Sequence, residues 1–309
     1  MSTLVLTGGV GGAKLVLGLT HVLPPEDITV IVNTGDDFQH LGLAISPDID
    51  TLLYTLSGRS NAAQGWGREG ETWSFMEALR SLDAEDWFLL GDGDLALHIL
   101  RTHWLSAGES LSCVTERFAT SWGLKSKILP MSDDKVATHV ATNAGDLSFQ
   151  RYFVEQRCAP PIQSVRFAGA QQARPAPGVI EAICSPKTSS ILIAPSNPWL
   201  SIDPILSVPD IVDALRRAKA PVVAISPIVG GQSVKGPTSK IMTELGIEIS
   251  NSSIARHYND VIDAILIDER DPADDLEVPF CATDILMTTL DDRIRVASEA
   301  LKLARSIAV

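Results

Sequence analysis

The sequence predicts an α/β protein with a Rossmann-like, doubly wound and mostly parallel sheet that carries a mainly helical insertion. Three observations support this prediction. A strand, a glycine-rich turn, a helix and a second strand follow one another in the first forty residues. Apolar runs typical of buried strands recur after residue 190, and amphipathic stretches separate several of them. Residues 51–125, which lie between these two parts, show mainly helical periodicity.

The N-terminal unit sets the pattern of the sheet. Residues 4–6 predict a short strand, "TGGVGGAK" a turn, residues 15–23 a helix, and residues 28–32 a buried second strand. Strands that alternate with helices in this way favour parallel pairing through crossover connections. Further strands are predicted at residues 191–194, 222–225, 264–267 and, more weakly, 285–287.

The middle of the chain differs from this pattern. Apolar residues recur at three- and four-residue spacing in "TWSFMEALRSL", "DLALHILRTHWL" and "LSCVTERFATSW", which predicts three helices. The next segment, "THVATNAGDLSFQRYF", predicts a hairpin around residues 143–145. We expect a single domain over residues 1–309, with the sheet core in 1–50 and 126–309 and the helical insertion in 51–125.

Composition excludes several classes of protein. The net charge of −13 argues against a nucleic-acid groove, since phosphate backbones require clustered Lys and Arg. The sequence has no run of eighteen apolar residues and no basic segment before its first apolar stretch, so we expect no membrane span, no signal peptide and a cytoplasmic location. The four cysteines are scattered, which predicts reduced thiols.

The glycine-rich turn matches neither standard nucleotide motif. Lys14 stands where a dinucleotide fingerprint needs its last glycine, and Ala13 and Leu15 break a Walker A loop. The turn can still bring backbone N–H groups to a phosphate at a helix N-terminus. The alternative is a tight turn with close helix packing.

The loop "NTGDDFQHLGLAISPDIDT" concentrates acidic residues after a predicted strand. Its aspartates lie where open α/β sheets bind ligands, and carboxylate oxygens suit Mg²⁺. In the alternative interpretation, Asp48 caps a helix that starts at Ile49, while Asp36 and Asp37 are solvated turn residues.

Two later loops, "APSNPWL" and "SPIVGGQSVKGPTSK", also follow predicted strands. Their polar groups could contact a purine base or a phosphate, with Lys235 and Lys240 adding positive charge, or they could be ordinary strand-to-helix loops. His98 and His103 are five residues apart and do not share a helical face, so the sequence does not indicate a zinc site.

A series of segments in one order resembles the 2-phospho-L-lactate transferase family, the CofD/FbiA-type enzymes of deazaflavin coenzyme biosynthesis. The combination of "SPDIDT", "ILPMSDD" and "PSNP" makes the resemblance specific. The full set is "TGGVGGAKLVLGL", "VNTGDDFQHLGLAISPDIDTLLYTLSG", "GWG", "GDGDLALH", "ILPMSDD", "IAPSNPWLSIDPIL", "SPIVGG", "KGPTSKIM" and "DERD".

The resemblance implies a reaction of coenzyme F-420 biosynthesis. A phospholactyl, phosphoenolpyruvyl or phosphoglyceryl group would pass from its guanosine diphosphate ester to the ribityl hydroxyl of the deazaflavin Fo, and GMP would leave. Such a transfer needs in-line positioning and neutralisation of phosphoryl charge, which Mg²⁺ can supply. The resemblance also implies a homodimer.

The resemblance carries over to particular residues. It implies catalytic roles for Asp48 and Asp50, and metal binding by Asp37 and Asp50. The glycines of the first loop would cradle phosphate, and the loops after residue 195 would lie on the guanosine side. The implied substrate contacts are Gly8, Gly9, Gly11, Gly12, Lys14, Asn33, Ser196, Asn197, Gly230, Gly231, Gly236 and Pro237.

One stretch departs from the family pattern. Family members often carry a basic residue inside "GD-x-D", where this chain has Gly93, and Leu89 occupies a preceding site that can also be basic. A contact to phosphate or carboxylate is therefore missing or supplied from elsewhere. Trp66, Trp73 and Trp87 are candidates for an apolar wall against a flat ring.

Two other functions fit parts of the sequence. A nicotinamide-dependent oxidoreductase would explain the N-terminal unit, but its fingerprint is broken. A non-catalytic nucleotide-sensing module would retain the glycine loops without needing the acidic loop beside them.

Overall fold

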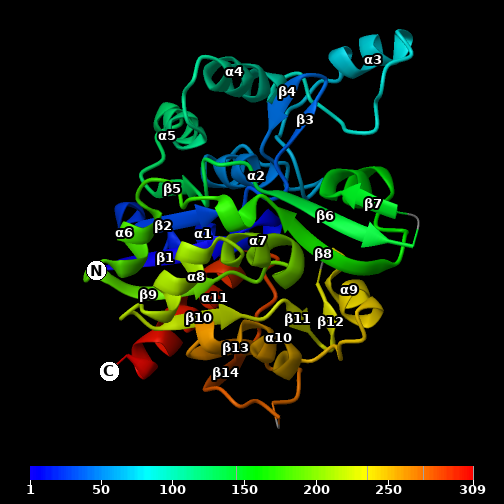
Figure 1. Ribbon diagram of the computed structural model, residues 1–309. Coiled ribbons are helices and arrows are strands. Elements are labelled where there is room, and N and C mark those ends of the chain that lie inside the picture. Colours follow the sequence, from blue (N-terminus) through cyan, green and yellow to red (C-terminus); the bar gives the residue numbers. More distant parts are fainter. Residues whose placement is uncertain (144, 235, 274, 309) are drawn as a thin grey trace.

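The computed structural model describes residues 1–143, 145–234, 236–273 and 275–308. At its centre is a seven-stranded sheet in the order β14-β13-β10-β9-β1-β2-β5 (Figure 1), and every neighbouring pair of strands is parallel. The strands are β1 Ser2–Thr7, β2 Ile28–Val32, β5 Lys127–Pro130, β9 Thr188–Ile193, β10 Val222–Ile225, β13 Ala264–Asp268 and β14 Phe280–Thr283.

This topology confirms the predicted doubly wound α/β sheet. From β1 the strand order proceeds to β2 and β5 on one side, and to β9, β10, β13 and β14 on the other. The order therefore reverses between β1 and β9. In open α/β sheets this reversal leaves a crevice at the carboxyl ends of the two strands, which is where ligands bind.

Alternating side chains of the strands form two apolar layers. Val5 of β1 packs on one face, with the helices α1 Gly9–Leu19, α2 Pro47–Leu56 and α11 Leu290–Ile307. Leu4 and Leu6 point to the opposite face. There they meet the helices α6 Val179–Cys184, α8 Pro209–Arg216, α9 Thr238–Glu244 and α10 Asn251–Tyr258.

The three helices expected between residues 51 and 125 are present, and they lie above the sheet in Figure 1. A short antiparallel hairpin that the sequence did not predict stands beside them. Ile45, Met76 and Leu90 form a separate small core there. The elements are α3 Ser74–Ser81, α4 Asp94–Ser106, α5 Leu111–Ser121, β3 Phe38–His40 and β4 Leu43–Ile45. The division into sheet core and insertion stays a prediction.

A second, antiparallel sheet stands at the side of the molecule (Figure 1). The predicted hairpin is confirmed in it, although Ala144 at the turn lies outside the described residues. The sheet consists of β6 Ala137–Thr142, β7 Gly145–Ser148 and β8 Ile162–Ala168. The remaining elements are a small hairpin of β11 Ile228–Val229 and β12 Gln232–Ser233, the helix α7 Asp203–Leu206, 3₁₀ turns η1 Pro25–Asp27, η3 Ala170–Gln172 and η5 Asn259–Val261, and π-helical turns η2 Arg151–Glu155 and η4 Pro198–Ile202.

Two strand assignments differ from the prediction. Residues 285–287 are not a strand, and the edge strand is β14. Ile285 and Met287 are nevertheless buried in the layer with α11, which explains their apolar signal. β5 forms the other edge of the sheet from a run of only four residues, and Pro130 is tolerated at its end because an edge strand needs fewer backbone donors.

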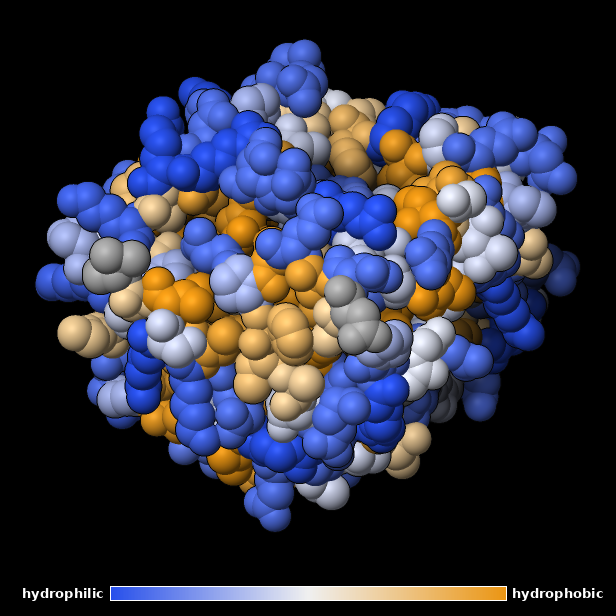
Figure 2. Space-filling model, turned by 90° about the horizontal axis from the view of Figure 1, so that it is seen from below, coloured by the Kyte–Doolittle hydropathy of each residue, from blue (hydrophilic) through white to orange (hydrophobic). Residues whose placement is uncertain are grey.

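One face of the molecule shows how its polar and apolar side chains are distributed. Seen from below, hydrophilic side chains dominate the periphery of the molecule and apolar ones gather nearer the centre of the face (Figure 2). Among the described residues no helix is both long and apolar enough to span a membrane. All four cysteines are free, as predicted, with Cys113 and Cys184 exposed.

The packing of α1 on α11 depends on Gly18, because a Cβ there would lie 2.2 Å from the backbone oxygen of Arg293. We expect Gly18→Ala to force the two helices apart and to lower the free energy of unfolding by about 1–3 kcal/mol, as overpacking does elsewhere. Urea unfolding measures this change. An unchanged midpoint would contradict the close approach.

Candidate functional site

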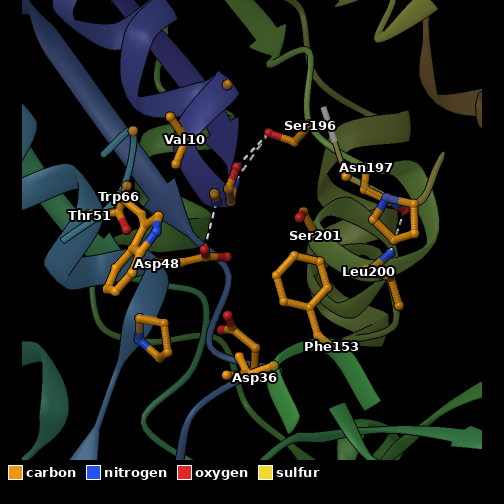
Figure 3. A pocket seen from close by; sticks show the side chains of 18 of the residues that line it. Val10, Asp36, Asp48, Thr51, Trp66, Phe153, Ser196, Asn197, Leu200 and Ser201 are labelled. Atoms are coloured by element: carbon orange, nitrogen blue, oxygen red, sulfur yellow. Dashed lines mark hydrogen bonds between the residues drawn. The ribbon is translucent and has the colours of Figure 1, made fainter. Parts of the chain in front are cut away.

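A cavity of about 740 Å³ opens at the point where the strand order reverses. Gly8 and Gly9 after β1 and Ser196 and Asn197 after β9 line it, and Asp48 faces them from the start of α2 (Figure 3). The three segments are far apart in the sequence and meet because β1 and β9 are neighbours in the sheet.

The predicted turn is wrong beyond Gly8, because α1 already begins at Gly9 and ends at Leu19 rather than spanning residues 15–23. This glycine-rich helix start fits tightly against its neighbours. A Cβ on Gly8 would lie 2.5 Å from a carboxylate oxygen of Asp48, and one on Gly12 would lie 1.6 Å from Oγ1 of Thr7. The Gly9 N–H donates to Oδ1 of Asp48 at 2.6 Å, and Oγ of Ser196 donates to the Gly8 carbonyl at 2.6 Å. Close packing, the alternative considered from the sequence, thus accounts for part of the motif.

The acidic loop is buried, so the interpretation of its aspartates as solvated turn residues is wrong for Asp36. Asp36 is 5% exposed and Asp48 is 8% exposed. The amide of Asn33 contacts both carboxylates, at 3.4 Å and 3.0 Å. The alternative interpretation of Asp48 as the N-cap of a helix from Ile49 is also wrong, since α2 begins at Pro47, a residue favoured in the first turn, and Asp48 lies inside that turn.

None of the ion pairs found among the described residues involves Asp36 or Asp48, and no basic group is among the causes that shift their pKa values. Burial raises the pKa of Asp36 well above its ordinary value, and the neighbouring Asp48 raises it further. Burial also raises the pKa of Asp48 from 3.8 to about 6, although hydrogen bonds from Asn33 and Gly9 oppose the increase. Two adjacent carboxylates with raised pKa values form a site where a cation or a proton is stabilised.

The negative charge of Asp50, unlike that of Asp36 and Asp48, is balanced by a basic side chain. Its carboxylate forms a buried pair with the guanidinium of Arg101, which is 1% exposed. His98 lies between two carboxylates. Its Nδ1 is 3.8 Å from Oδ2 of Asp50, and its Nε2 is 3.1 Å from Oδ2 of Asp94. Tyr54 donates its hydroxyl proton to Asp94. Burial raises the pKa of Asp50, and Arg101 opposes that increase.

Arg101 and His98 belong to the site although no sequence motif marks them. Asp94, His98 and Arg101 are spaced i, i+4 and i+7 on α4, which puts them on one helical face and is the signal that could have identified them. One ligand atom each from Asp50, Asp94 and His98 lie within 4.8 Å of one another, so these three residues could hold a metal ion.

Asp37 lies on the other side of the acidic loop. Oγ of Ser46 donates to its Oδ2 at 2.6 Å, and Asp37 lines a smaller cavity of about 210 Å³. Gly230 and Gly231 form the turn between β11 and β12, where both have positive φ, as such a turn requires.

The large cavity thus gathers most of the predicted site residues, and their roles stay predictions. Lys240 points to the Pro160 carbonyl and pairs with Glu244, and Lys235 lies outside the described residues. The predicted residues that line the cavity are Gly8, Gly9, Gly11, Lys14, Asp48, Asp50, Ser196, Asn197, Gly236 and Pro237. Those not among its lining residues are Gly12, Asn33, Asp37, Gly230 and Gly231.

Aromatic side chains also line the cavity. Trp66 and Phe153 stand on opposite sides in Figure 3, with Asp48 between them. Trp87 also lines the cavity, and the guanidinium of Arg151 lies 4.4 Å from the centre of its ring. Of the three tryptophans proposed from the sequence, Trp73 is not among the lining residues.

The place of the missing basic residue is filled by Arg68. A Cβ on Gly93 would lie 1.8 Å from the Arg68 guanidinium, so a side chain at 93 and this position of Arg68 exclude each other. Glu71 holds the arrangement, since it pairs with Arg68 at 3.1 Å and accepts from the Gly93 N–H at 2.6 Å. The Arg68 guanidinium thus occupies the space beside Gly93, paired with Glu71 and outside the lining of the large cavity.

Comparison with known proteins decides the family. The model of the family described as 2-phospho-L-lactate transferase CofD matches residues 3–297. The chain belongs to the CofD family. This confirms the resemblance found in the sequence, and with it a transferase of coenzyme F-420 biosynthesis, so the oxidoreductase and the nucleotide-sensing module are set aside.

Relatives within the CofD family carry two different names. A phosphoenolpyruvate transferase of Streptomyces griseus is 43% identical over 318 residues, which cover 99% of each chain. A 2-phospho-L-lactate transferase of Methanosarcina mazei is 41% identical over 293 residues, 93% of this chain and 95% of the relative. A solved UPF0052-family protein from Bacillus halodurans has a TM-score of 0.62 at 18% identity, over 97% of this chain and 98% of the other, and shows the same fold.

The pairing of Asp50 with Arg101 can be tested by a double-mutant cycle. Arg101→Met leaves a buried carboxylate without its partner, and we expect it to lower the free energy of unfolding by about 3–5 kcal/mol. Adding Asp50→Asn should recover much of this loss in urea unfolding. Arg80→Met, which removes an exposed pair, is the control and should change stability by less than about 1 kcal/mol. Additive losses in the double variant would show that the two residues do not act as a pair.

The raised pKa of Asp48 should make the stability of the fold depend on pH. Because its pKa is raised from 3.8 to about 6 in the folded protein, its proton stabilises the fold at low pH, and this contribution is lost as the pH rises through 6. The side chain of Asp48→Asn cannot titrate. In cation-free buffer the free energy of unfolding of this variant, relative to that of the parent, should therefore increase by more than about 1 kcal/mol as the pH rises from about 4 to about 6. Urea unfolding at several pH values measures the difference. A constant difference would be inconsistent with the raised pKa.

Proposed function

We propose that this chain transfers a phosphoenolpyruvyl or phospholactyl group from its guanosine diphosphate ester to the ribityl hydroxyl of Fo, with release of GMP. The proposal rests on the composition of the large cavity. A glycine-rich helix start, aromatic side chains and uncompensated carboxylates line it together. A phosphate donor and a flat acceptor can therefore meet beside a cation site.

The donor would bind at the sheet edge. Backbone N–H groups at the start of α1 suit a diphosphate. The loop after β9 lies next to α9, since Nδ2 of Asn197 donates to Oγ1 of Thr238 at 3.0 Å. Gly236 and Pro237 line the same side of the cavity, which supports a place for the guanosine there.

The acceptor would bind against the aromatic side chains. A deazaflavin ring is flat and mostly apolar, so Trp66, Trp87 and Phe153 offer surfaces on which it can stack. Its ribityl chain would then extend toward the carboxylates.

The residues of this site fit Mg²⁺. Octahedral Mg²⁺ is usually held by one or two carboxylates together with substrate phosphates and water. Asp36 and Asp48 suit this best, because both are buried, adjacent and uncompensated. Asp50 is already neutralised by Arg101, and metal binding by Asp37 and Asp50 stays a prediction. A bound Mg²⁺ would neutralise charge on the phosphoryl oxygens.

The chain's own groups would orient the acceptor. Arg101 fixes the carboxylate of Asp50, which lines the cavity and can accept a hydrogen bond from the attacking hydroxyl. In the transfer, the hydroxyl oxygen forms a bond to phosphorus, the bond from that phosphorus to the GMP oxygen breaks, and the hydroxyl proton passes to a carboxylate. The homodimer implied by the resemblance stays a prediction.

Transfer is tested directly by incubating the protein with Fo, Mg²⁺ and either guanosine diphosphate ester. Mass spectrometry should show Fo extended by the phospho-acid, and comparing the two esters identifies the natural one. Excess EDTA should stop product formation. Asp36→Asn should lower the rate at least about a hundredfold, since charge stabilisation by a metal is worth several kcal/mol.

Asp213→Asn is the control, because it removes the same charge from an exposed position on α8. It should retain the parent rate. Full activity in EDTA would remove the metal from the mechanism, and absence of transfer from both esters would overturn the proposed function.

A further inference from the structure

The cavity has an excess of negative charge that a phosphorylated substrate would increase. Four aspartates line it, Asp36, Asp48, Asp50 and Asp94. Among the described residues only one lysine and one arginine join them, Lys14 and Arg157. Nζ of Lys14 donates to the Met287 carbonyl at 2.7 Å. The role of Arg157 is therefore of interest, and neither the family resemblance nor the proposed mechanism uses this residue.

Arg157 has no partner within the described chain. Its side chain takes part in none of the ion pairs or hydrogen bonds found there, although most other arginines pair with a carboxylate. It is exposed to the cavity from the segment that follows η2. An unpaired guanidinium in a cavity rich in carboxylates is available to a ligand.

The backbone of Arg157 is strained. Its φ is +48° and that of Cys158 is +56°, so two successive residues other than glycine adopt the left-handed region. This conformation is unfavourable for residues with a Cβ and persists only where the surroundings impose it. A glycine at 157 would avoid the strain, so the fold itself gives no reason for an arginine there.

Hydrogen bonds around the segment impose that conformation. The Gln156 N–H donates to the Arg151 carbonyl at 2.9 Å, and the Cys158 N–H donates to the Tyr152 carbonyl at 2.9 Å. Nζ of Lys240 donates to the Pro160 carbonyl at 3.1 Å. The last contact ties the segment to α9, which begins immediately after the cavity-lining Gly236 and Pro237.

This connection gives Arg157 its place in the site. Through Lys240 its segment is fixed to the loop that the proposed function assigns to the guanosine side. A guanidinium donates charge-assisted hydrogen bonds to phosphate oxygens with a planar, two-pronged geometry that lysine lacks. Resting on that proposed function, we propose that Arg157 binds a phosphate oxygen of the guanosine diphosphate half of the donor.

Calorimetry with GDP and with guanosine separates a phosphate contact from a general effect on the cavity. Arg157→Gln should weaken GDP binding by roughly 10- to 100-fold, the range for a hydrogen bond to a charged group, while guanosine binding stays unchanged. Arg157→Lys should recover part of the loss. Arg174→Gln removes the same charge from a side chain that is 85% exposed, and it should bind GDP as the parent does.

Arg157→Gly distinguishes a ligand contact from a structural role. It removes both the charge and the backbone strain, so the thermal midpoint should be maintained or rise, while GDP binding falls as in Arg157→Gln. A lower midpoint together with unchanged GDP binding would make Arg157 a structural residue and overturn the proposal.

The remaining outcomes distinguish this inference from the function on which it rests. If the parent protein does not bind GDP, the proposed function fails. If the parent binds GDP and Arg157→Gln binds it equally well, only the assignment of Arg157 fails. An equal loss of guanosine binding, or a raised KM for Fo with an unchanged KM for the donor, would also overturn the assignment.

Discussion

The burial of several carboxylates beside one another is the constraint on which the site depends. Asp36, Asp48 and Asp50 are each less than a tenth exposed, and like charges in a dry environment repel strongly. The protein reduces this repulsion in two ways. Arg101 neutralises Asp50. Asp36 and Asp48 instead accept hydrogen bonds from the amide of Asn33, and their pKa values are raised. The proposed function assigns the cation to this uncompensated pair.

The fold stabilises the buried carboxylates because the acidic loop is held from several directions. The parallel sheet with helices on both faces supplies a large apolar core, and the loop leaves it at the carboxyl end of β2. The Gly9 N–H fixes Asp48 from α1, and Arg101 fixes Asp50 from α4. The helical region between residues 51 and 125 therefore completes the site as well as covering it, since it provides Arg101, His98 and Trp66.

Periodicity sufficed to predict β1, β2, β9, β10 and β13 and the helices between residues 51 and 125, because apolar runs reflect burial directly, but it did not predict the edge strands β5 and β14 or the long helix α11. It failed at residues 285–287, where burial occurs without strand pairing, and at β3 and β4, which are only three residues long. The glycine-rich segment and the acidic loop are visible in the sequence as motifs. Which aspartates are paired with a basic residue and which are not cannot be predicted from those motifs. This difference in pairing depends on Arg101, which lies 51 residues from Asp50 in the sequence and contacts it only in the folded protein.

Anomalous diffraction from crystals grown with Mn²⁺ and GDP would locate the cation. Mn²⁺ prefers the same oxygen ligands as Mg²⁺ and gives a signal that identifies its position. We expect one peak within bonding distance of Asp36 and Asp48, facing the nucleotide. A peak held instead by Asp50, Asp94 and His98 would contradict it, because the ion would then bind where Arg101 already balances the charge.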